Sequence, residues 1–189
     1  MDDYQKEIEL IEHLFYEGDL DELKKALPPL LELNVPAAIR INSSFFEPNT
    51  PEDEMDRIYL EGIFKAAELG DLKAQYQVGV FYDLGEYNIT QDKKKASHIF
   101  KELSEKGDPH CMWIHACELI WGKGSFPIST EEGLKLLQSA AEAGSANACI
   151  TIAGFYNNGD FGRQVDLEQR DRYRNLALEY DDTTYDPYA

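Results

Sequence analysis

Cysteine and histidine are the residue types in this sequence that could bind a metal ion, and several of them gather between residues 107 and 124. Cys111 and His115 are four residues apart, a spacing that places both on one face of a helix. A zinc site needs three or four ligands, whereas His110 points in another direction and the other histidines are distant in the sequence. We therefore predict no metal site and no cofactor, and a metal site is kept only as a least favoured alternative.

Cys117 is the candidate nucleophile, because the helical spacing described below places it on the face of a predicted groove. A helix interior offers no backbone amides to stabilise a thiolate, and only His110 is placed to act as its base. Cys149 is best explained as a small buried hydrophobic residue. The sequence shows no phosphate-binding loop, nucleophile elbow or pair of catalytic carboxylates. We predict that the protein is not an enzyme and has no catalytic residues, with a Cys/His-dependent enzyme as the least favoured alternative.

The segments that carry these residues repeat with a period near 37. Asn34, Gly70, Gly107 and Gly144 are spaced 36, 37 and 37 residues apart, and each is followed four residues later by a small residue. Counted from that small residue, position +5 is small, position +8 is apolar or aromatic, and position +11 is glycine or asparagine. These spacings fall on one helical face, so each repeat should begin with an amphipathic helix that ends near position +11. The residues at position zero are Ala38, Ala74, Cys111 and Ala148.

Capping residues indicate where the helices begin. The signals for first helices are Asp71, Asp108 and Ser145 as N-caps, with Pro36 and Pro109 at first helical positions. Second helices are indicated by Pro51 at a first helical position and by three pairs with capping-box spacing. These pairs are Asp19 with Glu22, Ser129 with Glu132, and Asp166 with Gln169. The small +5 residue should let the two helices of a repeat approach to about 8–10 Å between their axes.

The repeated pattern is A-x-x-x-L-G-x-x-Y-x-x-G, followed by a second helix that ends A-A-x-x-G. It resembles the Sel-one-like repeat (SLR) family, relatives of the tetratricopeptide repeats. The second repeat matches it best, with Ala74, Val78, Gly79, Tyr82 and Gly85. The first repeat departs from the pattern at Asn42 and Ser43, and the third at His115 and Ala116. The resemblance implies an all-α fold, a right-handed superhelical solenoid of about five stacked antiparallel helix pairs.

The resemblance covers residues 34–178 and sets the predicted domain organisation. Residues 1–33 should form an N-terminal capping helix pair, in which Pro28 and Pro29 interrupt the second helix. Residues 34–178 form the Sel-one-like repeat solenoid, with four units starting near residues 34, 70, 107 and 144. Residues 179–189 form an acidic C-terminal tail without apolar periodicity, either mobile or draped on the last helix.

A protein-binding groove is predicted on the first helices, which by the resemblance line the concave face of the solenoid. Helical geometry directs positions +2, +3, +6, +9 and +10 into this groove, including Gly154 at +6 of the fourth repeat. The candidate groove residues are Arg40, Glu47, Tyr76, Val80, Asp83, Trp113, Cys117, Trp121, Ile150 and Asn157. Aromatic and arginine side chains are typical anchors of protein interfaces. Alternatively, Trp113 and Trp121 only fill gaps between neighbouring repeats.

The charge of the chain restricts its partners. With 36 acidic against 18 basic residues, the formal net charge is −18, which repels phosphate backbones and anionic lipids. We expect neither nucleic acid nor membrane as a partner, and favour a basic protein. The sequence has no signal-peptide pattern and no apolar stretch long enough to span a membrane. The three cysteines lack disulfide spacing, so we expect a cytoplasmic protein.

These observations predict a non-catalytic repeat protein that binds another protein, without a small-molecule substrate. The more specific hypothesis is an acidic inhibitor or immunity protein that neutralises a basic toxin or effector, since negative charge would steer a cationic target to it. The link to such antagonism comes from the family resemblance. The alternative is an adaptor or scaffold for protein complexes in signalling or quality control.

Overall fold

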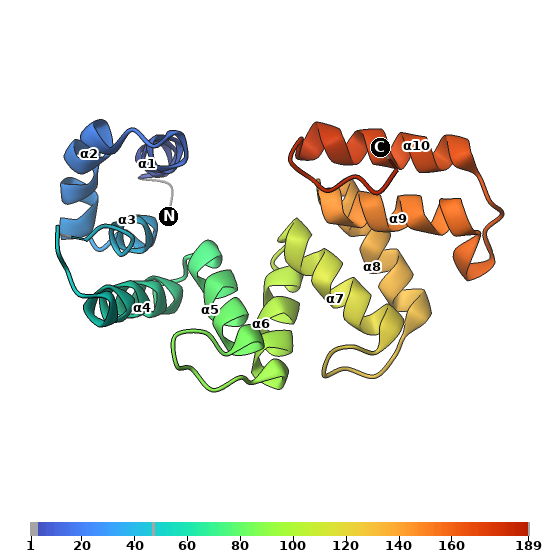
Figure 1. Cartoon of the computed structure of the whole chain (residues 1–189), viewed down its shortest axis with the longest axis horizontal. Coiled ribbons are helices and arrows are strands. Elements are labelled where there is room, and N and C mark those ends of the chain that lie inside the picture. Colours follow the sequence, from blue (N-terminus) through green and yellow to red (C-terminus); the bar gives the residue numbers. More distant parts are fainter. Residues whose placement is uncertain (1–3, 47, 189) are drawn as a thin grey trace. The chain divides into compact units, whose positions relative to one another are not determined.

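The computed structural model describes residues 4–46 and 48–188. Within these ranges all regular secondary structure is helical, and it consists of ten α-helices and one short 3-10 helix (Figure 1). The helices are α1 (Gln5–Glu17), α2 (Leu20–Glu32), α3 (Pro36–Asn42), α4 (Glu52–Glu68), α5 (Leu72–Leu84), α6 (Lys93–Glu105), α7 (Pro109–Trp121), α8 (Thr130–Glu142), α9 (Ala146–Asn158), η1 (Asp160–Gly162) and α10 (Leu167–Tyr180). Among these described helices, none is long and apolar enough to cross a membrane.

The helices form two compact units. The first unit, Met1–Gln91, holds α1 to α5, and the second unit, Asp92–Ala189, holds α6 to α10. Within each unit consecutive helices pack against one another, and α1 also contacts α3 as α7 contacts α9. Contacts between successive first helices are the stacking that a repeat array requires. The unit boundary falls between α5 and α6, inside the second predicted repeat, so the division into capping pair, four repeats and tail stays a prediction.

Each unit has its own hydrophobic core, built from the inward faces of its helices. In the first unit the main cluster joins α1, α2 and α3, and its buried residues are Ile11, Leu23, Leu27, Leu30, Val35, Ala37, Ala38 and Ile41. In the second unit the cluster joins α7, α8, α9 and α10, and its buried residues are Ala116, Ile120, Leu137, Ala140, Ala141, Ala146, Ala148, Cys149, Ile152, Phe155 and Ala177. Burial of these apolar side chains is the main force that holds each stack together.

Most predicted helix starts are confirmed by the capping geometry. The N-cap side chains that accept a backbone N–H three residues onward are Asp19, Asp71, Asp108, Ser145 and Asp166. Prolines lie in the first turn of α3 and α7 as predicted. Two details differ, since Ser129 precedes α8 without a side-chain capping bond, and Pro51 is the N-cap of α4 instead of its first helical residue.

The two prolines of α2 do not interrupt the helix, and that prediction was wrong. Pro28 and Pro29 lie inside one continuous helix, Leu20–Glu32. A proline removes the hydrogen bond to the residue four positions earlier. Here those earlier residues are exposed, so water can satisfy their carbonyl groups. Leu27 and Leu30, on either side of the prolines, are buried and hold the segment against the core.

The first helix of the first repeat is shorter than predicted. α3 ends at Asn42 and does not continue to Asn49. The hydroxyl of Ser43 donates to the carbonyl oxygen of Arg40 at 2.7 Å, and such side chain to backbone bonds compete with the helical pattern. As a result, Ser44 and the residues that follow it lie in the segment between α3 and α4.

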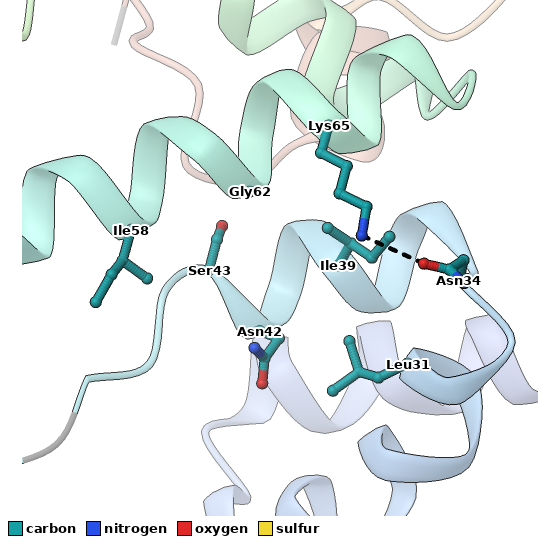
Figure 2. Close-up of a pocket in the computed structure, with 8 residues that line it drawn as sticks. All are labelled: Leu31, Asn34, Ile39, Asn42, Ser43, Ile58, Gly62 and Lys65. Atoms are coloured by element: carbon teal, nitrogen blue, oxygen red, sulfur yellow. Dashed lines mark hydrogen bonds between the residues drawn. The ribbon is translucent and has the colours of Figure 1, made fainter.

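Small residues let the two helices of a repeat cross closely, as the +5 positions predicted for the first and third repeats. A Cβ added to Gly62 of α4 would lie 2.3 Å from the Cβ of Ser43, which is the +5 residue of the first repeat. Figure 2 shows this crossing, where Lys65 of α4 also donates to Asn34 Oδ1 at 3.2 Å. A Cβ on Gly133 of α8 would lie 3.0 Å from the carbonyl oxygen of the +5 residue Ala116.

Candidate functional site

Two adjoining cavities of the first unit form the candidate binding site. The cavity that we call the groove pocket has a volume of about 360 Å³ and is lined by Phe15, Arg40, Ile41, Ser44, Tyr59, Ile63, Lys73, Tyr76 and Gln77. The cavity that we call the acidic pocket has a volume of about 370 Å³ and is lined by Ser44, Phe46, Glu52, Met55, Asp56, Tyr59 and Tyr87. Ser44 and Tyr59 line both cavities, so the two adjoin each other beside α4.

The groove pocket lies on the helix face that the repeat pattern predicted. Its lining includes positions +2, +3 and +6 of the first repeat and positions +2 and +3 of the second, on helices α3 and α5 and the segment after α3. The structure therefore brings Arg40 and Tyr76 of the predicted groove together. Phe15 of α1 is 39% exposed at the same site. Two successive repeats and the preceding helix pair thus contribute to one concavity.

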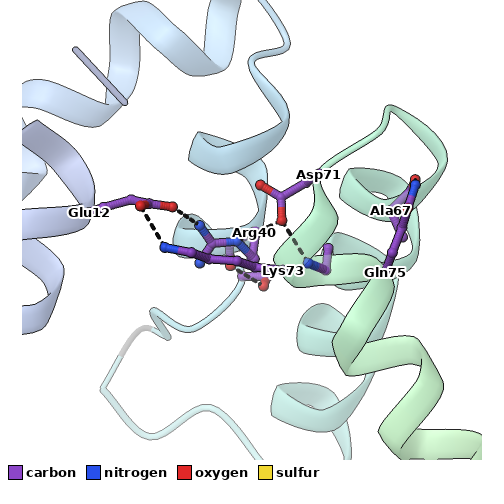
Figure 3. A network of polar contacts seen from close by, with 8 residues as sticks. Glu12, Arg40, Ala67, Asp71, Lys73 and Gln75 are labelled. Atoms are coloured by element: carbon purple, nitrogen blue, oxygen red, sulfur yellow. Dashed lines mark hydrogen bonds and ion pairs between the residues drawn. The ribbon is translucent and has the colours of Figure 1, made fainter. Parts of the chain in front are cut away.

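Arg40 lies in the groove pocket, but its charge is committed to intramolecular ion pairs. The guanidinium contacts Glu12 of α1 at 2.6 Å and Asp71 at 2.9 Å, and its side chain is only 13% exposed. Lys73 of α5 contacts the second carboxylate oxygen of Glu12 at 2.6 Å. Asp71 also accepts the backbone N–H of Ala74 at 2.6 Å (Figure 3). Arg40 therefore ties α1, α3 and α5 together and is not a free anchor for a partner.

The acidic pocket is built on one face of α4. Glu52, Met55, Asp56 and Tyr59 follow one another at helical spacings of three and four residues, so their side chains lie on the same side. Within the described residues, neither Glu52 nor Asp56 takes part in an ion pair. Their negative charges are therefore available to a ligand. In contrast, Arg57, on another side of α4, pairs with Glu54 and Glu61.

Tyr87 closes the acidic pocket from the loop that follows α5. Its backbone has φ 53° and that of Asn88 has φ 60°, a left-handed conformation that is strained for a bulky side chain and that clusters at functional sites. The ring of Tyr87 packs 5.6 Å from that of Tyr59 and 5.1 Å from that of Phe81. These contacts fix the ring of Tyr87 in the wall of the pocket that Glu52 and Asp56 also line.

The two tyrosines of the acidic pocket have raised pKa values. Burial, together with the charges of Asp56 and Glu86, raises the pKa of Tyr87. Burial, with smaller contributions from Tyr87 and Glu86, raises the pKa of Tyr59. At neutral pH both tyrosines therefore keep their protons and can donate hydrogen bonds. The pocket combines carboxylates with electron-rich aromatic faces, which is a suitable environment for a cation.

The predicted groove residues of the second unit occupy several environments. Trp113 donates from its indole N–H to Thr151 Oγ1 at 3.0 Å and packs, like Ile150, against the core of α7 to α10. Trp121 is 42% exposed and contacts the edge of Phe155. Asn157 accepts a hydrogen bond from Arg170 at 3.4 Å. Trp113 thus fills the space between neighbouring repeats, which is the alternative that the sequence left open for it.

The remaining candidate groove residues that the structure describes do not line the groove pocket or the acidic pocket. Val80 and Asp83 are half-buried on α5 and line neither of the two pockets. Cys117 is half-buried on α7. Glu47 lies outside the described residues.

The cysteines and histidines are explained by packing. Cys111 is fully buried, and burial raises the pKa of the Cys117 thiol to about 12, which makes it a poor nucleophile. His115 Nδ1 lies 3.2 Å from a carboxylate oxygen of the buried Glu118, whose other oxygen accepts the hydroxyl of Ser97. In the described part of the chain, no three His, Cys, Asp or Glu side chains gather in a group that could hold a metal ion.

Sequence reasoning missed the acidic pocket. Glu52, Asp53 and Glu54 lie in the first turn of α4, where negative charge is favourable in any helix and therefore indicates no binding site by itself. A signal was nevertheless present, because Glu52, Asp56 and Tyr59 share one helical face. The contribution of Tyr87 could not be found in this way. It depends on a strained loop that meets α4 from almost thirty residues along the chain.

Comparisons with known proteins agree with the fold. No protein-family model matches the chain, and no curated protein matches its sequence. A Sel1 repeat protein from Oxalobacter formigenes aligns with a TM-score of 0.67 and 21% identity over 92% of this chain and 70% of that one. A protective antigen of uropathogenic Escherichia coli strains that displays an SLR fold aligns with a TM-score of 0.62 and 22% identity, over 83% of this chain. The alignment covers 33% of the antigen.

These likenesses confirm the predicted fold class. The described chain is all-α and has the Sel1-like repeat solenoid fold of helix pairs.

Proposed function

We propose that this chain is a protein-binding repeat protein, and more specifically an acidic inhibitor or immunity protein that binds and neutralises a basic toxin or effector. The observation that carries the proposal is the acidic pocket of the first unit. It joins two unpaired carboxylates to three aromatic side chains in a cavity of about 370 Å³. Solenoid repeats commonly present such concave surfaces to other proteins.

The chemistry of the acidic pocket fits a lysine or arginine side chain of the partner. Glu52 and Asp56 would form charge-assisted hydrogen bonds with the cationic group. Tyr59 and Tyr87 would contact the cation and the alkyl chain through their rings, a combination that strengthens when water is excluded. Phe46, which is 37% exposed, supplies apolar surface at the rim. The partner residue therefore serves as an anchor seated in a pocket.

The net charge of −18 supports the same partner at longer range. Charge of one sign raises the rate of encounter with a protein of the opposite sign, and salt weakens this steering. An inhibitor benefits from a high association rate because it must reach its target before the target acts. An adaptor for signalling or quality control does not need this dependence, so salt sensitivity separates the two functions.

The experiment is a comparison of matched bait variants in affinity purification from the native host. The double variant Glu52→Gln with Asp56→Asn removes both charges of the pocket. The control, Asp53→Asn with Glu68→Gln, removes the same charge from exposed positions of α4 that do not line the pocket. We expect a basic protein to co-purify with the wild type and the control, and to be depleted with the pocket variant. Equal recovery with all three baits would rule out the pocket as the binding site.

A further inference from the structure

The C-terminal segment folds back onto the second unit. α10 ends at Tyr180, after which the described chain turns and runs back along the same helix (Figure 1). The sequence left open whether the tail is mobile or draped on the last helix, and its described residues lie along that helix. The contacts are made by two residues near its end, Asp186 and Tyr188, with α10 and α9.

Asp186 is bound as a ligand carboxylate would be. It is only 10% exposed, and one of its oxygens accepts the guanidinium Nε of Arg174 at 2.5 Å. The other oxygen accepts the backbone N–H of Tyr188 at 2.8 Å, which fixes the turn between the two residues. Burial opposes the charged form, but these hydrogen bonds hold the pKa of Asp186 below its ordinary value. The carboxylate is therefore ionised and fully engaged at neutral pH.

Tyr188 packs against α9 at Gly154, a residue without a side chain. The guanidinium of Arg170 lies over its ring at 5.6 Å from the centroid. Its hydroxyl reaches Gly154 of α9, where an added Cβ would lie 3.3 Å from the oxygen. Gly154 is position +6 of the fourth repeat, and the equivalent positions of the other repeats carry Ser44, Val80 and Cys117. The absence of a side chain at this position leaves room for the tip of the phenol.

From this geometry we propose that α9 and α10 form a peptide-binding site for an aspartate followed two residues later by a tyrosine, and that the chain's own Asp186-Pro187-Tyr188 fills the site in cis. Arg174 recognises the carboxylate, Arg170 the aromatic ring, and Gly154 the hydroxyl end. A partner segment of the same acidic and aromatic chemistry competes with the tail for this site. The proposal goes beyond the acidic pocket, which lies in the other unit and selects the opposite charge.

The tail is connected to α10 by a segment that allows a partner peptide to replace it in the site. Residues 181–183 are exposed, and Tyr185 is 82% exposed, so this connection adds little packing of its own. Segments held by few buried contacts open at low cost in free energy. A tethered ligand nevertheless has an effective concentration of about a millimolar, which lets it occupy a weak site and mask that site from free peptide.

The test measures binding of a fluorescent peptide with the sequence of residues 183–188, Thr-Thr-Tyr-Asp-Pro-Tyr, by fluorescence polarisation. The full chain with Asp186→Ala and Tyr188→Ala vacates the site. We expect this opened chain to bind the peptide about tenfold tighter than the wild type does, because the tail no longer competes. Peptides with asparagine for the aspartate, or with leucine for the last tyrosine, should lose that affinity.

Arginine variants of the opened chain identify the binding surface. Adding Arg174→Gln should abolish peptide binding, whereas Arg172→Gln removes the same charge from an exposed position of α10 and should leave it unchanged. Circular dichroism and the melting temperature verify that each variant is folded, because Arg172 and Arg174 lie within α10. Equal affinity of the opened and wild-type chains, no binding by the opened chain, or equal loss in both arginine variants would each overturn the proposal. None of these results bears on the acidic pocket.

Discussion

At the residue scale, Arg40 lines the groove pocket, but its guanidinium forms ion pairs within the protein and does not serve as an anchor for a partner. The repeat pattern assigned it to a binding groove, and in the structure it lines one cavity together with Tyr76. The pattern could not show that Glu12 and Asp71 neutralise it, because these ion pairs join residues about thirty positions apart. The face on which a side chain of a helical repeat lies can thus be inferred from periodicity, but its partners on other helices need the structure.

Replacing Arg40 tests its role in stability. Arg40→Ala leaves Asp71, which is 9% exposed, without its cation, whereas Glu12 keeps its ion pair with Lys73. We expect a loss of about 1.5–3 kcal/mol in the free energy of unfolding, the range for hydrogen bonds to charged groups. Arg40→Lys should recover only part of this loss, because an ammonium cannot donate in two directions from one planar group. Urea unfolding measures both, and an unchanged midpoint for Arg40→Ala would show that the network is not stabilising.

The thiols provide a pH-dependent prediction. Burial raises the pKa of Cys117 to about 12 and that of Cys149 to about 11, so little thiolate is present near pH 8. We expect iodoacetamide to alkylate the native chain about a hundredfold more slowly than the urea-unfolded chain at pH 8. Because the pKa values are raised, the native rate should keep increasing through pH 10. A native rate that levels off near pH 9 would show an ordinary, accessible thiol.

The elements themselves were largely predictable. N-cap residues and the period near 37 located the starts of most helices, because capping and hydrophobic periodicity are local properties of the sequence. The errors arose where context overrode local preference. Exposed carbonyl groups let α2 continue through Pro28 and Pro29, and a serine hydroxyl ended α3 early. The short α3 matters for the site, since it frees Ser44 and Phe46 to line the acidic pocket.

The crossing of α3 and α4 offers a test at the scale of elements. Gly62→Ala places a Cβ 2.3 Å from that of Ser43, so the helices must move apart. Overpacking of this kind costs about 1–3 kcal/mol, which should appear as a lower melting temperature and a lower urea midpoint. The double variant Gly62→Ala with Ser43→Gly restores the space and should recover much of the stability. Strictly additive effects of the two changes would contradict the proposed contact.

At the scale of the whole molecule, the all-α repeat fold could be predicted from the sequence, whereas the proposed binding sites could be predicted only in part. Repetition of one register four times made the fold predictable. The acidic pocket and the tail site both depend on segments outside the helices, namely the loop with Tyr87 and the tail with Asp186 and Tyr188. Such segments carry no periodic signal, so no pattern in the sequence places them against the helices.

The net charge of the whole chain acts on a partner at longer range than any single contact does. With a net charge of −18, association with a basic protein should slow about tenfold or more between low and high salt, as electrostatic steering is screened. Dissociation should change less, because it depends on contacts in the pocket. Stopped-flow or surface-based kinetics with the co-purified partner measure both rates. An association rate independent of salt would favour the adaptor or scaffold function instead.

The most direct test of the central claim is the affinity of that partner for the Glu52→Gln, Asp56→Asn variant relative to the wild type. Truncating the charges that receive a buried cation should weaken binding by about 2–5 kcal/mol, seen mainly as faster dissociation. The control Asp53→Asn, Glu68→Gln should change only the association rate, and slightly. Wild-type affinity in the pocket variant would contradict the assignment of this pocket as the binding site.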